Sequence, residues 1–208
     1  MSPLLMVWML GCGSPEAPVV EAPPEVVLPD GGLTEGEAAV TPEGQTGRDR
    51  RRMTVPQLAD SIEVATGLRW MDGSNDRFEE FEATLGVPDW FERTTENLNP
   101  DLVFNKLLED AATEVCESLV AEEASGGDRL LVGVDLSMTV DTHRTEIESA
   151  LSSALLRFHG HDVPVGDDRL GGWVWLFESS TNVTDGDTEI AWRAVCTALI
   201  VHPDFYTY

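Results

Sequence analysis

The chain has 208 residues, of which 42% are hydrophobic and 7% aromatic, so it can bury a substantial core and is long enough for one domain. It carries 38 acidic against 13 basic side chains, a formal net charge of -25, and Lys106 is its only lysine. Because nucleic-acid affinity depends on Lys and Arg neutralising phosphates, this composition excludes nucleic acid as an expected partner and favours solubility as the role of the acidic surface.

The N-terminus resembles the leader of a bacterial lipoprotein. Residues 3–10 read PLLMVWML, a short apolar run that ends in Gly11-Cys12-Gly13-Ser14. In such leaders a peptidase cuts before a cysteine that has received diacylglycerol, which would make Cys12, bearing lipid such as palmitate, the mature N-terminus. No apolar run reaches the roughly eighteen residues of a spanning helix, so we expect the membrane to be reached through the lipid anchor only.

Two features of this leader are atypical. Its apolar run is short, and no Lys or Arg precedes Arg48, whereas secretory leaders begin with a basic region. A start codon further upstream would account for both features. The alternative is a cytosolic protein with an apolar N-terminus.

Three segments are expected along the chain: a signal peptide at residues 1–11, a disordered acidic tether at residues 12–50 and a folded domain at residues 51–208. The tether is rich in Pro, Glu, Gly, Ala and Val and lacks the apolar periodicity that compensates for the entropy of ordering. At residues 48–52 four arginines surround Asp49. We interpret them as the entrance of the domain, paired with its acidic surface, and a functional basic patch is the alternative.

Signals for six or seven helices predict an all-α domain, built as a compact bundle or an orthogonal array. The first helix begins at the capping box of Thr54 and Gln57 and ends at Gly67. A second is expected over residues 74–86, and a short one opens at residues 88–90. A long helix begins at Asn99-Pro100-Asp101, with a capping side chain and a proline in the first turn, and runs to about Glu122.

The second half of the domain begins with its only segment of strand character, residues 130–136, which read LLVGVDL. Periodicity alone does not distinguish a strand from a buried extended segment in so short a run. The next helix is capped by Asp141 and closed by Gly160. Another is expected over residues 167–177. Asp187 caps the last helix, and Pro203 ends it.

The weak metal candidates are His159, His161 and Asp162, whose two imidazoles and one carboxylate suit zinc or copper. Histidine at a helix C-terminus also complements the helix dipole, and no second pair of ligands is apparent. We therefore predict no metal, no cofactor and no catalytic residue. The sequence carries no haem-attachment motif, phosphate loop, nucleophile elbow or zinc-protease motif.

Residues 72–76 begin like a calcium-binding loop. Arg77 and Ala83 stand where that loop requires glycine and an acid, so the EF-hand pattern fails. A turn leading into a helix cap is the expected structure. We expect the same of residues 185–187.

Cys116 and Cys196 remain once Cys12 is acylated, and an even number of cysteines in an exported chain favours pairing. Both lie on or beside the inward stripes of predicted helices. Helices packed about 8–10 Å apart can bring two such Cα atoms within the roughly 4.4–6.8 Å of a disulfide. We predict this bond, and two separate buried thiols are the alternative.

Three segments of the domain carry a resemblance to a known family: Arg52-Met53-Thr54 with the following Gly67, LLRFHG at residues 155–160 and TALIVHPDFYTY at residues 197–208. In these segments the domain resembles the helical modules of a planctomycete-type, cytochrome-c-associated family of exported proteins. The resemblance implies a secreted companion of larger redox or hydrolase-like partners. It carries over no catalytic residue, and this chain lacks the haem motif of the cytochrome-bearing members.

Six aromatic side chains of the C-terminal third have two interpretations: Trp173, Trp175, Trp192, Phe205, Tyr206 and Tyr208. They form a docking face, or they belong to the core, the favoured interpretation for the three tryptophans because of the apolar area each buries.

Together these features predict a lipid-anchored protein of the periplasm or cell surface whose helical domain binds another exported protein. The rival is a metal-dependent hydrolase-type enzyme that uses His159 and His161. An enzyme requires these histidines to converge with acids in a pocket, whereas a binding domain requires an exposed apolar patch.

Overall fold

The computed structural model describes residues 51–88, 91 and 94–208, all of which fall within Gly47–Tyr208, the second of the two units into which the chain divides. The predicted leader, Cys12, the tether and the predicted helix start at residues 89–90 lie outside the described residues. The described part is all-α, as the sequence predicts, with seven α-helices and one two-stranded hairpin. None of its helices is long and apolar enough to cross a bilayer.

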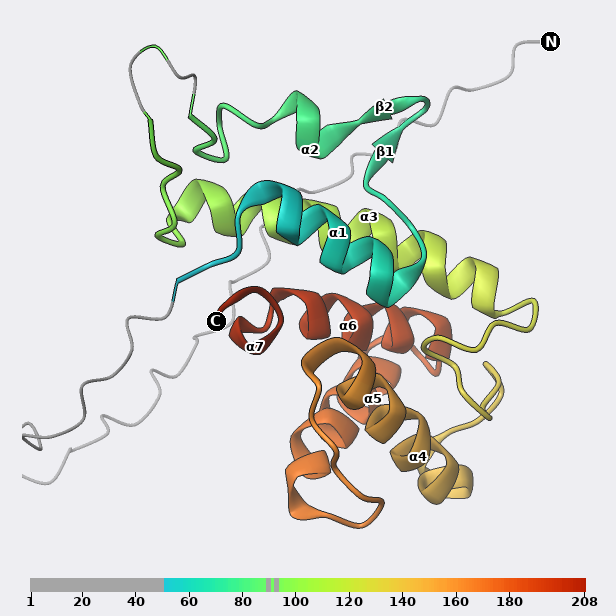
Figure 1. Ribbon diagram of the computed structural model, residues 1–208. Coiled ribbons are helices and arrows are strands. Elements are labelled where there is room, and N and C mark those ends of the chain that lie inside the picture. Colours follow the sequence, from blue (N-terminus) through green and yellow to red (C-terminus); the bar gives the residue numbers. More distant parts are fainter. Residues whose placement is uncertain (1–50, 89–90, 92–93) are drawn as a thin grey trace, which may run out of the picture. The chain divides into compact units, whose positions relative to one another are not determined.

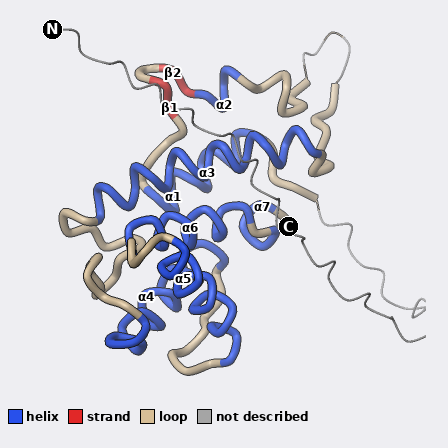
Figure 2. The backbone as a smooth tube through the Cα atoms, turned by 180° about the vertical axis from the view of Figure 1, so that it is seen from behind, coloured by secondary structure: helices blue, strands red, loops and turns tan. Residues whose placement is uncertain are grey.

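The helices pack in three layers around one hydrophobic core (Figure 1). The first layer holds α1 (Val55–Thr66) and α3 (Leu102–Glu123), and the middle layer holds α6 (Thr188–Val201) and α7 (Pro203–Tyr206). The third layer holds α4 (Val140–His159) and α5 (Gly171–Val183), with the short 3-10 helix η1 (Asp168–Leu170) before α5. The view from behind shows the same order of layers (Figure 2).

Local capping signals set the ends of α1 as predicted. The hydroxyl of Thr54 accepts a hydrogen bond from the Gln57 backbone N–H, and the Gln57 side chain accepts one from the Thr54 N–H. Gly67 ends the helix with a φ of 79°, a conformation that favours glycine. The Arg129 guanidinium lies over Gly67, where a Cβ would be 2.1 Å from its Nη1.

Three other helix starts differ from the prediction. Asp101, not Asn99, caps α3, and its carboxylate accepts a hydrogen bond of 2.8 Å from the Phe104 N–H. Asp141 lies within the first turn of α4, whose N-cap is Thr139. Residues 167–177 divide into η1, capped by Asp167, and α5, which extends to Val183. Asp187 caps α6 as predicted, through a bond from the Ile190 N–H.

The helix predicted over residues 74–86 is confirmed only at Arg77–Glu80. A hairpin takes its first part, with β1 (Met71–Asp72) paired antiparallel to β2 (Asn75–Asp76) around Gly73, which has a φ of 59°. Asp76 then caps the short helix α2 (Arg77–Glu80). A tight turn needs only local glycine and Asx chemistry, and here it prevails over the apolar spacing of Phe78, Phe81 and Leu85. The turn expected at residues 72–76 is confirmed.

The segment of strand character at residues 130–136 pairs with no strand in the described part of the chain, because a buried carboxylate takes the backbone donors at its start. The Glu123 side chain, at the end of α3, accepts bonds of 2.7, 2.8 and 2.7 Å from the N–H groups of Arg129, Leu130 and Leu131. Glu123 is only 6% exposed, so these three donors compensate for its desolvation. Leu130 and Leu131 are buried in a loop that runs in turns.

Arg52 joins the first described residues to the last ones. It pairs in an antiparallel bridge with Thr207, and its guanidinium is buried over the Phe104 ring. Its Nη1 lies 3.0 Å from a carboxylate oxygen of Glu96, and its Nη2 donates to the carbonyl of Leu85 at 2.6 Å. The predicted pairing of the arginine cluster with an acidic side chain is therefore seen for Arg52.

The predicted disulfide is present. Cys116 and Cys196, both fully buried, have their Cα atoms 5.7 Å apart and join the middle of α3 to the middle of α6. The two helices run antiparallel, because Phe104 contacts Tyr206 near one end of the pair, while Glu117 contacts Arg193 toward the other.

Removing this bond should lower the stability of the domain substantially. The cysteines are 80 residues apart in sequence, and a cross-link over a loop of that length stabilises by about 4 kcal/mol through its effect on the unfolded chain. We expect a Cys116→Ser/Cys196→Ser variant to unfold at a lower urea concentration than the oxidised wild type. Unfolding of the wild type under reducing conditions is the matched control, and full alkylation of both cysteines without reduction would contradict the bond.

Candidate functional site

A groove of about 760 Å³ lies on the surface between α3 and α6. It is much larger than the hollow of about 280 Å³ between α1 and α4. Its walls come from one face of each helix and from α7: Asn105, Leu108, Glu109, Thr113, Glu117, Ile190, Arg193, Ala194, Thr197, Ala198, Val201 and Tyr206. A volume of several hundred Å³ with a largely apolar lining is typical of a binding site.

The groove exists because α6 presents small side chains to this side of α3. Ala194, Thr197 and Ala198 share one face of α6 through the i, i+3, i+4 spacing, and they are only half-buried against the neighbouring helix. The disulfide between Cys116 and Cys196 holds the two helices at a fixed spacing, with the two Cα atoms 5.7 Å apart. The packing of α3 against α6 therefore sets both the distance between the two helices and the depth of the groove.

The rim of the groove is acidic. Glu109 and Glu117 are exposed on α3. Arg193, the one basic lining residue, lies 3.2 Å from Glu117 and also pairs with Glu189. Because one guanidinium is shared by two carboxylates, the rim keeps an excess of negative charge, while Ile190 adds an apolar side chain that is 42% exposed.

A second group of side chains, here called the histidine cluster, lies at the corner between α6 and α7. It consists of His159, His161, His202, Trp173 and Asp204. The His159 ring centroid is 4.9 Å from that of His202 and 5.8 Å from those of His161 and Trp173. Asp204 Oδ2 lies 3.7 Å from His202 Nδ1 and 4.0 Å from His161 Nε2.

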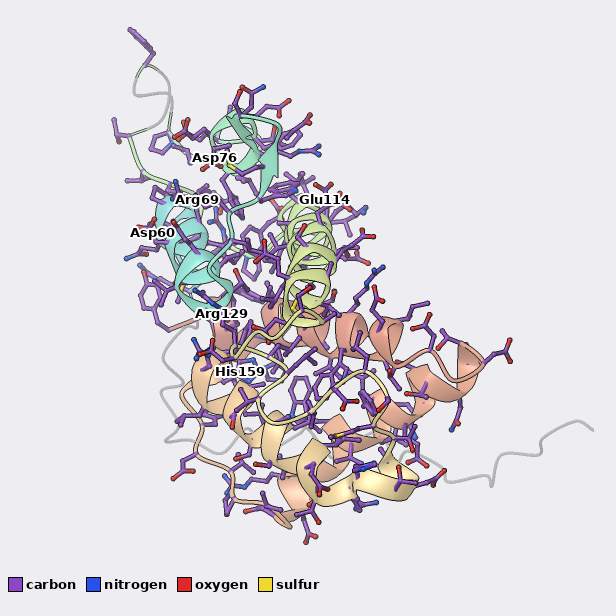
Figure 3. The ribbon with its side chains drawn as sticks, turned by 90° about the vertical axis from the view of Figure 1, so that its right-hand side faces the viewer. Asp60, Arg69, Asp76, Glu114, Arg129 and His159 are labelled. Atoms are coloured by element: carbon purple, nitrogen blue, oxygen red, sulfur yellow. A yellow bond between two sulfur atoms is a disulfide. The ribbon has the colours of Figure 1, made fainter. Side chains whose placement is uncertain are left out.

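His159, labelled in Figure 3, links the end of α4 to the end of α6. Its Nε2 lies 2.9 Å from the carbonyl oxygen of Leu199, so this nitrogen carries a proton and donates it. Partial burial lowers the pKa of His159 below its usual range, and the neighbouring His202 and His161 lower it further against the opposing effects of Leu199 and Asp204.

The sequence identified only part of this cluster. His159 and His161 do come together, but Asp162 is exposed, and the acid of the cluster is Asp204. His202 and Asp204 were not singled out as site residues, because no local pattern connects them to a histidine about forty positions earlier. Over the described residues, no group of three or more His, Cys, Asp and Glu side chains is arranged to hold a metal ion.

The aromatic side chains divide between core and surface. Trp192, Phe205 and Tyr206 are buried. Burial raises the pKa of Tyr206 above its usual value. The core interpretation is wrong for Trp175, which is 67% exposed, and Trp173 is half-buried in the histidine cluster. Tyr208 is also exposed, so these six residues do not share one docking face.

Charged side chains near the hairpin hold it against the first layer (Figure 3). Arg69 lies 2.9–3.2 Å from Asp60 and Glu63 of α1 and from Asp76 of β2. On α3, Glu114 accepts a bond of 3.0 Å from the Trp70 indole N–H and pairs with Arg77. These charged and polar groups pair with one another, and their contacts explain the position of the hairpin.

Comparison of the chain with protein-family models, with curated proteins and with solved structures found no significant match. The resemblance to the cytochrome-c-associated family therefore stays a prediction.

We expect the purified protein to carry no haem and no stoichiometric transition metal. Two of the imidazole nitrogens in the histidine cluster already bond protein groups: His159 Nε2 to the Leu199 carbonyl, and His202 Nδ1 to the Asp204 N–H at 3.2 Å. Visible absorption and elemental analysis after dialysis provide the measurement. One equivalent of zinc, lost in a His159→Ala/His161→Ala variant, would support the enzyme hypothesis instead.

Proposed function

We propose that this chain is a lipid-anchored exported protein of the periplasm or cell surface, and that its helical domain binds a segment of another exported protein in the groove between α3 and α6. The observation that carries the proposal is the groove itself, with its volume of about 760 Å³ and its mainly apolar lining. Its size matches sites that receive apolar side chains from a ligand or partner.

The dimensions of the groove suit a short segment of polypeptide. The α3 wall extends from Asn105 to Glu117, which is about 18 Å of helix at a rise of about 1.5 Å per residue. That length accommodates about three turns of an amphipathic helix or a short extended strand. Ile190, Ala198 and Val201 offer apolar contacts along it.

Charge indicates what kind of segment fits. Glu109, Glu117 and Glu189 outnumber Arg193 around the groove, and the whole chain has a net charge of -25. An acidic segment would be repelled, whereas Lys or Arg next to apolar residues would pair with the rim. The proposed occupant is therefore an apolar segment flanked by basic residues.

Two observations support export. The apolar leader ending at Cys12 suits lipid attachment, and the Cys116–Cys196 bond suits an oxidising compartment, since structural disulfides are rare in the cytosol. After acylation of Cys12, these two cysteines are the only ones left to pair.

Filling the groove should weaken partner binding. Ala194→Leu places a larger side chain on the half-buried face of α6, and we expect it to reduce co-purification of the partner from native membranes roughly tenfold, as for a blocked central contact. Ala121→Leu makes the same change at an exposed position of α3 outside the groove and is the matched control. Equal capture of the same proteins by wild type and Ala194→Leu would contradict the proposal.

A charge reversal in the same assay tests the basic nature of the partner. Glu109→Lys on the rim should weaken capture, and more so at low salt, whereas Glu122→Lys, exposed on the same helix outside the groove, should not.

Lipid attachment should be visible in the mass of the protein. Intact-mass analysis of membrane-extracted protein is expected to show a chain that begins at an acylated Cys12, because membrane attachment through acyl chains depends on that residue. Cys12→Ala should release the domain into the soluble fraction. A free thiol at Cys12 together with an uncut Met1 would refute the anchor.

A further inference from the structure

The histidine cluster and the groove share the corner between α6 and α7. His202 and Asp204 of the cluster lie between Val201 and Tyr206, which both line the groove. Any change in the bonding of His202 would therefore take place next to the end wall of the groove. This inference rests on the proposed function, because it concerns how binding in that same groove is regulated.

We propose that the histidine cluster makes binding in the groove pH-dependent, strong at neutral pH and weaker in acid, because protonation of His202 removes the cap of α7.

The neutral state depends on an unprotonated nitrogen. His202 is the N-cap of α7, and its Nδ1 accepts a bond of 3.2 Å from the Asp204 backbone N–H. Most helices are capped by an oxygen acceptor that does not titrate near neutral pH, whereas an imidazole accepts at Nδ1 only while that nitrogen is deprotonated. Histidine is the side chain whose ordinary charge change falls between about pH 5 and pH 8, so a histidine cap, unlike an oxygen cap, is open to control by pH.

Protonation reverses the contacts of His202. A protonated Nδ1 is a donor, so it turns from the Asp204 N–H toward the Asp204 carboxylate, whose Oδ2 is 3.7 Å away. The short helix α7 has only four residues, and losing its cap affects most of its length. Tyr206, which lines the groove and contacts Phe104 of α3, belongs to this helix.

The surrounding groups reinforce the effect. His159 at the end of α4, His161 just after it and Trp173 of α5 face His202, and Asp204 is the one carboxylate of the cluster. Full protonation would place three positive rings, with centroids 4.9 and 5.8 Å from the central one, around a single negative charge. Trp173, 6.1 Å from His202, favours the charged ring through its π face and only partly offsets this repulsion.

His159 acts in the same direction. Burial lowers its pKa, followed by smaller contributions from His202 and His161. A depressed folded-state pKa means that the neutral imidazole is favoured by folding, so its contribution to stability is present above about pH 6.5, the unfolded value, and is lost as the pH falls through the folded-state pKa. Protonated His159 still donates from Nε2 to the Leu199 carbonyl, so the cap of α7 is the contact that acid removes.

The test follows the full chain between pH 7.5 and pH 5 by two measurements. Amide and imidazole NMR signals should show the Asp204, Val201 and Tyr206 amides moving with the midpoint of the His202 ring. Binding of the neutral apolar dye Nile red, as a probe of the groove, should weaken about fivefold in acid, the fold-change equivalent to losing one helix cap.

Two variants isolate the residue responsible. In His202→Asn, a capping side chain that does not titrate, both pH effects should disappear while dye affinity at pH 7.5 is kept. His143→Asn, at the histidine outside the cluster, should keep both effects. The part of the dye signal that is lost in Ala194→Leu is the part that comes from dye bound in the groove.

The possible results separate the two proposals. If the Asp204, Val201 and Tyr206 amides do not titrate with His202, or if His202→Asn keeps the pH dependence, the switch is refuted and the groove is unaffected. If Ala194→Leu leaves dye binding unchanged while those amides still titrate with His202 and stop doing so in His202→Asn, the switch is supported and the groove as a binding site loses support.

Discussion

The antiparallel packing of α3 against α6 is the contact on which the rest of the domain depends. The middle layer formed by α6 touches α3 on one side and α4 and α5 on the other (Figure 1). The Cys116–Cys196 bond crosses between the first and middle layers at a point where both residues are fully buried. Because it connects residues 80 positions apart, it restricts the unfolded chain more than a local cross-link would.

The same helix pair is densely packed on one side and hollow on the other. Interior packing of proteins leaves few voids larger than a water molecule, so a space of about 760 Å³ must lie at the surface and depend on which side chains face it. Ala194 and Ala198 are too small to fill the space, and Glu109 and Glu117 border it with charge that favours solvent or a basic partner. The packed core and the open groove thus occupy different faces of the same helices.

Buried polar groups hold the segments that have no regular structure. Arg52 bonds carbonyl oxygens and Glu96, and Glu123 accepts three backbone N–H groups, so neither charge is left without compensation. His202 belongs to the same class of contact, since its side chain organises the backbone of α7. It differs in one respect: the acceptor is an imidazole nitrogen, which accepts only while it is deprotonated, whereas most caps use an oxygen.

The sequence by itself determined the helical class of the domain, the ends of helices set by Gly67 and Asp187, and the pairing of the two buried cysteines. These features depend on contacts within a few residues, or on a count of cysteines and the inward stripe of a helix. Only the tertiary structure decided that Glu123 accepts bonds from the backbone N–H groups at the start of residues 130–136. It alone also brought His159 into contact with Leu199 and His202. The groove was likewise hidden, because a hollow depends on the sizes of side chains facing each other across two helices, and no spacing along one chain segment encodes that relation.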